Sequence, residues 1–263
     1  MSREIKLCKI KKLAKNGSSK VDDKVVSEEP LSIIVDGRPY SILMRTPGDE
    51  KDLVLGFLYS EGIINGPEEI DFIHYCSKEK EKNTVVAGLK SKKKLKQKKR
   101  AHEVRSSCGI CGKEVIEDLR KNLKNISSKE IFFFKNLIDL DKKIVKKQKI
   151  FKLTGGTHAA ALFDIEGKLI LLREDIGRHN ALDKIAGYII RKKIDCRDKI
   201  IFLSGRTSYE MILKVIRLGA PVVASISGTT SLAVDLSKEF NLTLIGFLRG
   251  EKMTVYSHPE RIK

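Results

Sequence analysis

The sequence predicts an α/β protein in which a larger α/β domain, residues 151–263, follows a smaller α+β unit. The length of 263 residues suits one or two domains. Hydrophobic residues make up 41% of the chain and charged residues 33%, which is the balance of a globular protein with a substantial core. After Phe151, apolar strand-like runs alternate with helical patterns, as is typical of an α/β layer fold.

The N-terminal segment, residues 1–24, is polar and rich in lysine, and we expect a disordered basic tail there. Order is expected from Val25. The run that continues to Arg45 predicts two strands joined at Asp36-Gly37, a dipeptide that supplies the positive φ angles of a tight hairpin turn.

A helix is predicted between Asp49 and Gly62. Leu53, Phe57 and Leu58 recur there at helical spacing, and the glycine ends the pattern. Two further strand-like runs follow, at 70–75 and 84–89.

The chain is expected to divide into three ordered parts. Residues 25–105 form the small α+β unit, which ends in a lysine-rich loop. Residues 106–150 hold a cysteine-containing loop and connecting helices, with amphipathic patterns at about 114–123 and 136–149. Residues 151–263 form the α/β domain.

In the α/β domain, strands are expected where short apolar runs are bounded by turn residues, and helices where longer amphipathic runs occur. The predicted strands lie at about 159–164, 168–173, 199–203, 221–226 and 242–248. The predicted helices lie at about 178–193, 207–218 and 230–240.

The formal net charge is +18, which at first suggests a nucleic-acid partner. The charge is unevenly distributed, because residues 25–77 carry 3 basic and 10 acidic side chains, whereas residues 78–105 carry 12 and 3. The centre of the basic segment, residues 91–100, reads SKKKLKQKKR and has no aromatic side chain to stack on a base. A solvated loop and a binding patch both remain open, and nucleic acid becomes an unlikely partner.

No apolar run approaches the roughly 20 residues of a membrane span, and the N-terminus has no apolar centre typical of a secretory signal. We therefore expect a cytoplasmic protein without membrane contact. The five cysteines are an odd number and are mostly far apart, so they make no disulfide framework.

Cys108 and Cys111 form the one close cysteine pair, within Ser-Ser-Cys-Gly-Ile-Cys-Gly-Lys. A thiol pKa of roughly 8.5 falls to roughly 3.5–7.5 near a helix N-terminus, a cation or a second cysteine, and all three conditions are plausible here. The pattern favours nucleophilic sulfur chemistry. Half of a structural zinc site and a thioredoxin-like redox pair remain alternatives, although no second cysteine pair exists and a charged loop precedes this one. No metal site is predicted.

Three turns rich in Gly, Ser and Thr precede or follow strands of the α/β domain. One is Thr154–His158 before a strand. The other two follow strands and open helices, where free backbone amides bind anions, so they favour a phosphate or pyrophosphate ligand. Ordinary helix capping is the alternative. The candidate residues in these two turns are Ser204, Gly205, Arg206, Ser227, Gly228 and Thr229.

A dense polar run, residues 173–184, lies between a strand and a helix. Asp175, Arg178 and His179 could serve as acid, base or ligand contacts, or could cap and stabilise the helix start. His158, beside two glycines, leaves the same two possibilities open.

Several segments together resemble the formate dehydrogenase accessory sulfurtransferases of the FdhD type, over roughly residues 25–262. They are EEPLSIIVDG, DLVLGFLYSEGII, SSCGICGK, LTGGTHAAAL, REDIGRHNALDK, LSGRTSYEM, GAPVVASISGTTSLAV and GFLRGEKMTVYSHPERI. The resemblance implies a cytidine-deaminase-like three-layer α/β/α domain after the smaller unit, and a homodimer. The tail before Val25 and residues 91–100 have no clear counterpart.

The resemblance also implies a sulfurtransferase that acts through a cysteine persulfide. A cysteine desulfurase would load sulfur onto Cys108, with Cys111 as the assisting thiol. The sulfur would then pass to a molybdenum or tungsten bis(molybdopterin guanine dinucleotide) cofactor, bound as substrate, before its insertion into the catalytic subunit of formate dehydrogenase. The implied cofactor contacts are Phe247, Leu248, Arg249, Gly250, Glu251 and Lys252.

Two other functions are alternatives to sulfur transfer. A zinc deaminase needs a Glu two places after a ligand His, and neither His158 nor His179 has one. The other is a non-catalytic chaperone that binds a cofactor or nucleotide, for which the cysteines would be dispensable.

Overall fold

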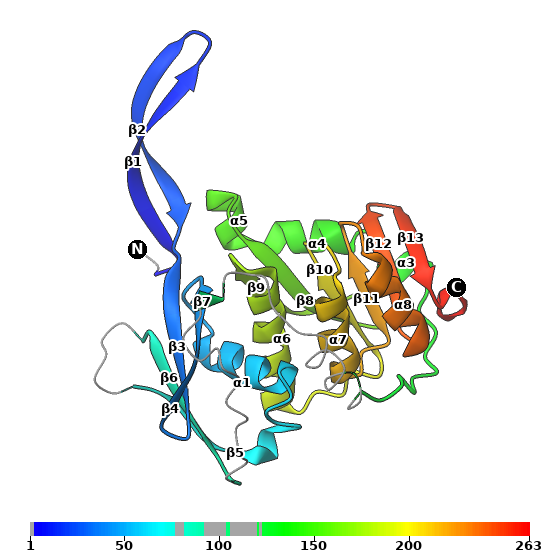
Figure 1. Cartoon of the computed structure of the whole chain (residues 1–263). Helices are drawn as coiled ribbons and strands as arrows, with labels where there is room; N and C mark the ends of the chain where they lie inside the picture. The colour runs from blue at the N-terminus through cyan, green and yellow to red at the C-terminus, as the bar shows by residue number, and fades with distance from the viewer. Residues whose placement is uncertain (1–2, 77–81, 92–103, 106–119, 121–122) are drawn as a thin grey trace.

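A computed structural model describes residues 3–76, 82–91, 104–105, 120 and 123–263. These residues form a mixed α/β fold with three sheets, of two, five and six strands (Figure 1). The two-stranded sheet projects from the body as an arm, while the other two sheets carry the helices.

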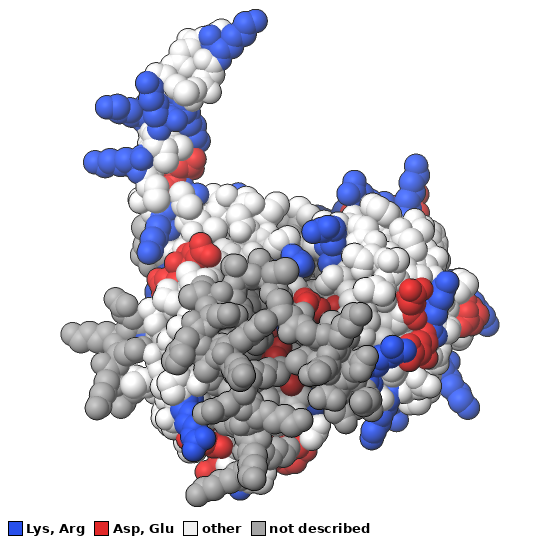
Figure 2. Space-filling view, viewed as in Figure 1, with Lys and Arg blue, Asp and Glu red and all other residues white. Residues whose placement is uncertain are grey.

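The arm is a hairpin of β1 (Ile5–Ala14) and β2 (Gly17–Val26). The expected disorder over residues 1–24 is therefore wrong for the part that the structure describes. Apolar side chains meet across the ladder, with Ile10 opposite Val21, and the two-residue turn Lys15-Asn16 is followed by Gly17, whose φ is 136°. Lysine side chains project from the arm in Figure 2.

The N-terminal unit contains the hairpin predicted at Asp36-Gly37, both of which have positive φ angles, 49° and 75°. Its five-stranded sheet has the order β5-β6-β3-β4-β7 and covers the helix α1. The elements are β3 (Glu29–Val35), β4 (Arg38–Arg45), α1 (Glu50–Ser60), the 3-10 turn η1 (Pro67–Glu69), β5 (Ile70–Tyr75), β6 (Thr84–Leu89) and β7 (Val104–Arg105).

The six-stranded sheet has the order β13-β12-β11-β10-β8-β9. Its three central strands β10, β11 and β12 are parallel, while β8, β9 and β13 run antiparallel to their neighbours. All five strands predicted for residues 151–263 are confirmed, and each observed end lies within two residues of the predicted end. The strands are β8 (His158–Asp164), β9 (Leu169–Asp175), β10 (Lys199–Leu203), β11 (Val222–Ser225), β12 (Thr243–Arg249) and β13 (Lys252–Ser257).

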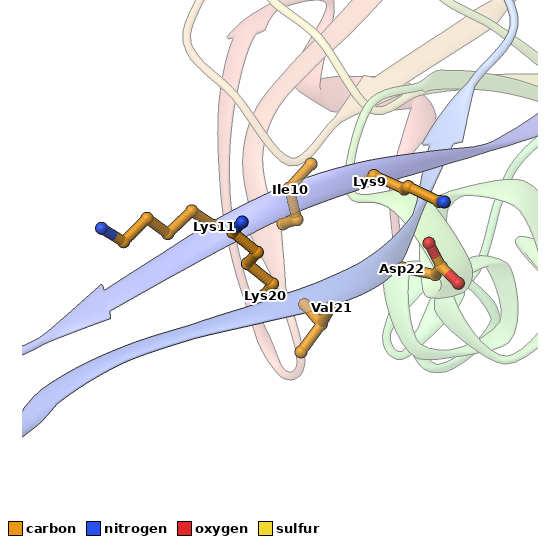
Figure 3. Close-up of a pocket in the computed structure, with 6 residues that line it drawn as sticks. All are labelled: Lys9, Ile10, Lys11, Lys20, Val21 and Asp22. Atoms are coloured by element: carbon orange, nitrogen blue, oxygen red, sulfur yellow. The ribbon is translucent and has the colours of Figure 1, made fainter.

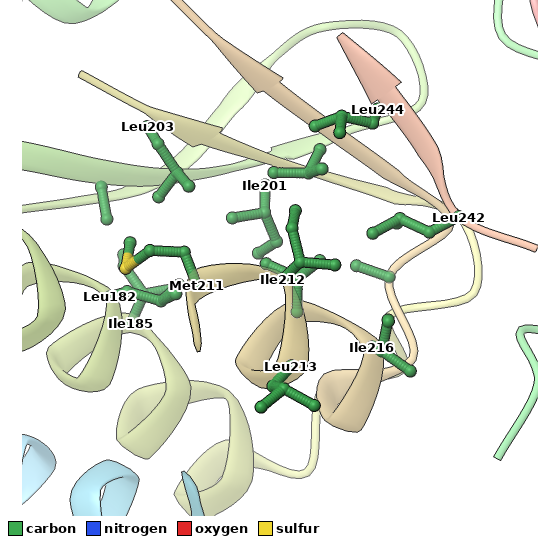
Figure 4. Close-up of a cluster of buried hydrophobic side chains, with 14 of the residues drawn as sticks. Leu182, Ile185, Ile201, Leu203, Met211, Ile212, Leu213, Ile216, Leu242 and Leu244 are labelled. Atoms are coloured by element: carbon green, nitrogen blue, oxygen red, sulfur yellow. The ribbon is translucent and has the colours of Figure 1, made fainter. Parts of the chain in front are cut away.

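Helices cover both faces of this sheet. The three predicted helices are confirmed on one face as α6 (Arg178–Lys192), α7 (Tyr209–Leu218) and α8 (Ser231–Glu239), where they enclose the core shown in Figure 4. The other face is covered by α3 (Phe134–Leu137) and α4 (Leu140–Lys147), which divide the amphipathic stretch predicted at 136–149. The short helix α5 (Lys149–Thr154) follows them and contacts β2 of the arm, and a 3-10 turn η2 (Pro259–Arg261) lies near the C-terminus.

The sequence of β8 is continuously apolar because successive residues pack on opposite faces of the sheet, both of which are buried. Ala160 and Leu162 pack with α6 and α7, while Ala161 and Phe163 pack against α3 and α4. A strand buried on both faces cannot alternate between apolar and polar residues. In the described part of the chain, no helix has the length and apolar character needed to cross a membrane.

Candidate functional site

One edge of the six-stranded sheet gathers most of the predicted site segments. The parallel strands β10, β11 and β12 end at this edge, and the antiparallel strand β8 begins there. His158, the first residue of β8, pairs with Asp175, the last residue of β9, and lies two positions beyond the pair Ala160 and Leu203. Ligands of open α/β sheets collect outside such strand ends.

The turns after β10 and β11 are joined by backbone hydrogen bonds. The Thr207 amide donates to the Gly228 carbonyl over 3.2 Å, and the Thr230 amide donates to the Thr207 carbonyl over 3.2 Å. The Ser225 hydroxyl donates to the Gly205 carbonyl over 2.7 Å. These bonds fix the first turns of α7 and α8 side by side.

Ser208 and Thr230 occupy the N-cap positions of α7 and α8, but neither side chain makes a capping hydrogen bond. The Thr207 and Ser208 hydroxyl oxygens are buried, and neither has a hydrogen-bond partner among the described residues. The structure thus does not support capping by these side chains. It leaves the amide ends of two neighbouring helices available to an anion.

The polar residues predicted in these turns have different roles. The Ser204 hydroxyl accepts the Ala159 amide over 2.8 Å, and the Thr229 hydroxyl donates to the Thr207 carbonyl over 3.2 Å, so both hold the backbone in place. Arg206 is exposed and can meet a ligand.

The end of β12 lies against the second turn. The Phe247 amide donates to the Ser227 carbonyl over 3.1 Å, and Arg249 Nε donates to the Ile226 carbonyl over 3.2 Å. Phe247 has a φ of 51° and the residue is 48% exposed. A Cβ atom added to Gly228 would lie 3.0 Å from that ring, so the glycine lets the ring approach the turn. Phe247 and Arg249 thus add an aromatic face and a cation to the candidate edge.

The rest of the predicted contact segment is divided between core and surface. Leu248 is completely buried, so only its backbone can reach a ligand. Gly250 has a φ of 56° at the hairpin tip, and its amide donates to Asp141 over 3.1 Å. Glu251 and Lys252 are exposed.

Asp175 is a structural residue. Its carboxylate is fully buried and accepts hydrogen bonds from the amides of Thr46 and Gly177, from Asn180 Nδ2 and from Lys184 Nζ, the last over 2.8 Å. Because Thr46 follows β4, this carboxylate ties the N-terminal unit to the start of α6. It is fully occupied and does not face a ligand with a free oxygen.

His158 and His179 stand beside Arg178 at the same edge. Burial, followed by the positive charges of Lys214 and Arg178, lowers the pKa of His179 to about 3. Burial and Arg178 also lower the pKa of His158. Both imidazoles are therefore neutral at pH 7. The sequence identified these residues as candidates but did not predict that they lie close together. They do so because β8 and β9 are antiparallel, which places the start of β8 beside the end of β9.

Cys108 and Cys111 lie outside the described residues, as do residues 92–100 of the lysine-rich segment. On the C-terminal side of the cysteines, Arg120 forms an ion pair with Glu239 of α8 over 2.6 Å. Cys196, by contrast, is described and buried, and burial raises its pKa to about 12, which disfavours its thiolate form.

Two surface depressions lie away from the candidate edge. One, of about 520 Å³, is on the arm, where side chains from both strands surround it (Figure 3). The other, of about 400 Å³, lies between Tyr59 of α1 and Arg217 near the end of α7, at the opposite edge of the sheet. Among the residues with described positions, no group of three or more His, Cys, Asp or Glu could hold a metal ion.

Comparisons with known proteins give one consistent result. A family model described as the FdhD/NarQ family matches residues 26–263. A protein of Sulfurisphaera tokodaii named "Sulfur carrier protein FdhD" is 40% identical over 98% of this chain and 99% of its own. A Picrophilus torridus protein of the same name is 44% identical over 92% of this chain and 93% of its own.

A crystal structure from Desulfotalea psychrophila, assigned as a formate dehydrogenase accessory protein, has the same fold. Its TM-score is 0.80 at 24% identity, and the match covers 98% of this chain and 99% of that chain. At this identity the likeness shows the fold alone.

Proposed function

The chain belongs to the FdhD/NarQ family, and from that premise we propose that it is a sulfur carrier for the maturation of formate dehydrogenase. It accepts persulfide sulfur from a cysteine desulfurase. It transfers this sulfur to a molybdenum or tungsten bis-guanine-dinucleotide pterin cofactor, which is its substrate. The observation that carries the proposal is the match to relatives named as sulfur carriers over almost the whole chain.

Loading is a thiol–persulfide exchange. The Cys108 thiolate attacks the outer, sulfane sulfur of the donor's persulfide, which forms a new S–S bond on Cys108 and releases the donor cysteine as a thiolate. The proton of the persulfide stays with the transferred sulfur, so charge and atoms balance. Such an exchange requires an accessible thiol with a substantial thiolate fraction.

Release uses the second cysteine. The Cys111 thiolate attacks the inner sulfur of the Cys108 persulfide, which forms a Cys108–Cys111 disulfide and expels hydrosulfide toward the substrate metal. A dithiol reductant must then reduce the disulfide before the next cycle.

The described sheet edge supports the choice of acceptor. Guanine dinucleotides carry pyrophosphate groups, which suit the two open helix starts, Arg206 and Arg249. The exposed ring of Phe247 offers a stacking surface for a guanine base. The proposal also includes a cytidine-deaminase-like three-layer α/β/α domain, in keeping with helices on both sheet faces, and a homodimer.

The decisive experiment is mass spectrometry after incubation with a cysteine desulfurase and cysteine. We expect one added sulfur atom on the peptide that contains Cys108, absent from Cys108→Ala. A matched control is Cys8→Ser, because Cys8 is on the arm and should leave loading unchanged. Loading of Cys108→Ala at the wild-type level would disprove the carrier function, and release from Cys111→Ser at the wild-type rate would disprove the disulfide step.

A non-catalytic cofactor chaperone is the second candidate, because the anion-binding edge is built without the cysteines. It predicts that Cys108→Ala still supports formate dehydrogenase maturation in cells. The carrier function predicts that this variant binds the cofactor and fails to mature the enzyme.

A further inference from the structure

We infer that the arm of one molecule docks on the edge strand β5 of a second copy of this chain. The inference goes beyond the proposed function, because it names the surfaces through which two copies meet and does not rest on sulfur transfer. The family match begins at residue 26, the last residue of β2, so nearly all of the arm precedes it.

The arm carries positive charge that its own aspartates do not neutralise. Residues 5–26 include seven lysines and two aspartates. Lys11 lies directly opposite Lys20 in the ladder, and like charges at such positions repel each other. Lys12 forms an ion pair with Asp23 over 3.1 Å, whereas neither Lys11 nor Lys20 forms one with a residue that the structure describes. Both lysines line the depression on the arm in Figure 3, and an anionic surface laid against it would relieve their repulsion.

The arm also leaves large apolar side chains in water. Leu7 is 52% exposed, and Leu13, beside the turn at the far end, is 76% exposed. A hairpin of two strands is only marginally stable by itself in water. A partner that covers these leucines would therefore stabilise the arm.

The outer edge of β5 has the properties that complement the arm. β5 is the last strand of the five-stranded sheet, and no described strand pairs with its outer side. Glu68 of η1 and Asp71 of β5 are exposed, and neither forms an ion pair within the described part of the chain. Phe72 adds an aromatic ring and is 43% exposed. The β5 edge thus offers carboxylates to the lysines, an apolar surface to the leucines and unpaired backbone groups to an open strand.

The arm and β5 of one molecule cannot meet each other. Figure 1 shows them at opposite ends of the molecule, with the body of the protein between them. Two copies related by a twofold axis can instead place each arm beside the β5 edge of the other copy, so that the same contact forms twice. A second copy is the occupant because every molecule of this protein carries both the cationic arm and the acidic edge.

The test uses two charge-reversed variants of the full-length protein, studied by sedimentation equilibrium separately and as an equimolar mixture. Lys11→Glu, Lys20→Glu reverses the arm, and Glu68→Lys, Asp71→Lys reverses the β5 edge. Each variant alone brings like charges together in both contacts, so we expect its dimer dissociation constant to rise at least about tenfold. The mixture should associate as the wild type does, because both contacts of the mixed dimer again join opposite charges.

The matched control is Lys146→Glu, Lys147→Glu, which makes the same change of charge on exposed residues of α4 and should associate as the wild type does. A second measurement needs no variant. The dissociation constant of the wild type should rise as sodium chloride is added, because salt screens exposed charges.

Several outcomes would overturn the docking of the arm on β5. They are wild-type association of either reversed variant, a mixture that associates no better than its components, a dissociation constant that does not respond to salt, and a wild type that is monomeric at micromolar concentrations. Sulfur loading on Cys108 reports on the carrier function alone, so the two proposals fail separately.

Discussion

Gly56 of α1 and Gly187 of α6 lie where the two helices touch backbone to backbone. A Cβ atom on Gly56 would be 1.9 Å from the Asp183 carbonyl oxygen, and one on Gly187 would be 1.8 Å from the Asp52 carbonyl oxygen. This crossing joins the N-terminal unit to the α/β domain. Arg191 on α6 and Asp52 on α1 reinforce it with a two-bond ion pair of 2.7 and 3.0 Å.

Gly187→Ala should destabilise the protein, because the added methyl group forces α1 and α6 apart. We expect a loss of about 1–3 kcal/mol in the free energy of unfolding, measured by urea denaturation. Lys192→Ala, at the exposed end of the same helix, is the control and should change stability by less than about 0.5 kcal/mol. A Gly187→Ala protein as stable as that control would show that the helices are not in backbone contact.

Asp175→Ala should lower the free energy of unfolding strongly, because it leaves the buried, charged Lys184 without its carboxylate partner. Removing one partner of a buried ion pair costs about 3–5 kcal/mol. The double variant Asp175→Ala, Lys184→Met should recover part of that loss, which a double-mutant cycle in urea measures. Additive losses from the two substitutions would mean that the pair is not coupled.

Stability should fall as the pH is lowered from about 6.5 towards 3, partly because of His179. Its folded-state pKa is lowered from 6.5 to about 3, so in this window the unfolded chain binds the proton and the folded protein does not. The His179 contribution is therefore complete above pH 6.5 and is lost on acidification. Its slope approaches about 1.4 kcal/mol per pH unit. His179→Gln should flatten the urea-derived stability profile in this range, and an unchanged profile would contradict the assignment.

Phe247→Ala should weaken the binding of guanine nucleotides and spare pyrophosphate. Loss of one aromatic–base stack costs about 1–3 kcal/mol, which corresponds to roughly 5- to 150-fold in affinity. Phe72→Ala is the control, because Phe72 is similarly exposed but lies on β5, in the sheet of the N-terminal unit. Equal losses for GDP and pyrophosphate would place Phe247 outside a base contact.

The sequence predicted the α/β domain well because its strands are buried on both faces and its helices end at clear breaks. The stretch Lys199–Leu203 is continuously apolar after its first residue, and Gly219 follows α7 with a φ of 77°. The arm was missed because the lysines of β1 predict a solvated tail and its apolar residues Ile5, Leu7, Ile10 and Leu13 do not alternate regularly. The Asn-Gly dipeptide at its turn was the signal that could have identified it.

The candidate site was predicted in pieces rather than as a unit. Ser, Thr and Gly turns after strands are local patterns, so the segments after β10 and β11 could be identified from sequence. The meeting of His158 with Arg178 depends on the antiparallel pairing of β8 and β9, and the proximity of Gly205 depends on β10 lying beside β8. Strand order is a tertiary property, which residue spacing alone does not reveal.

Among the strands that the structure describes, none pairs with the outer edges of the arm, so each edge could pair with a strand from another molecule. Lysines at positions 6, 9, 11, 20 and 24 would repel the same lysines of a second arm, whereas Lys12 forms an ion pair with Asp23. The positive charge of the arm thus opposes edge-to-edge polymerisation. Concentrated salt shortens the range of that repulsion to about 3 Å, so it no longer opposes pairing of the edges. This protein should therefore be handled at low ionic strength.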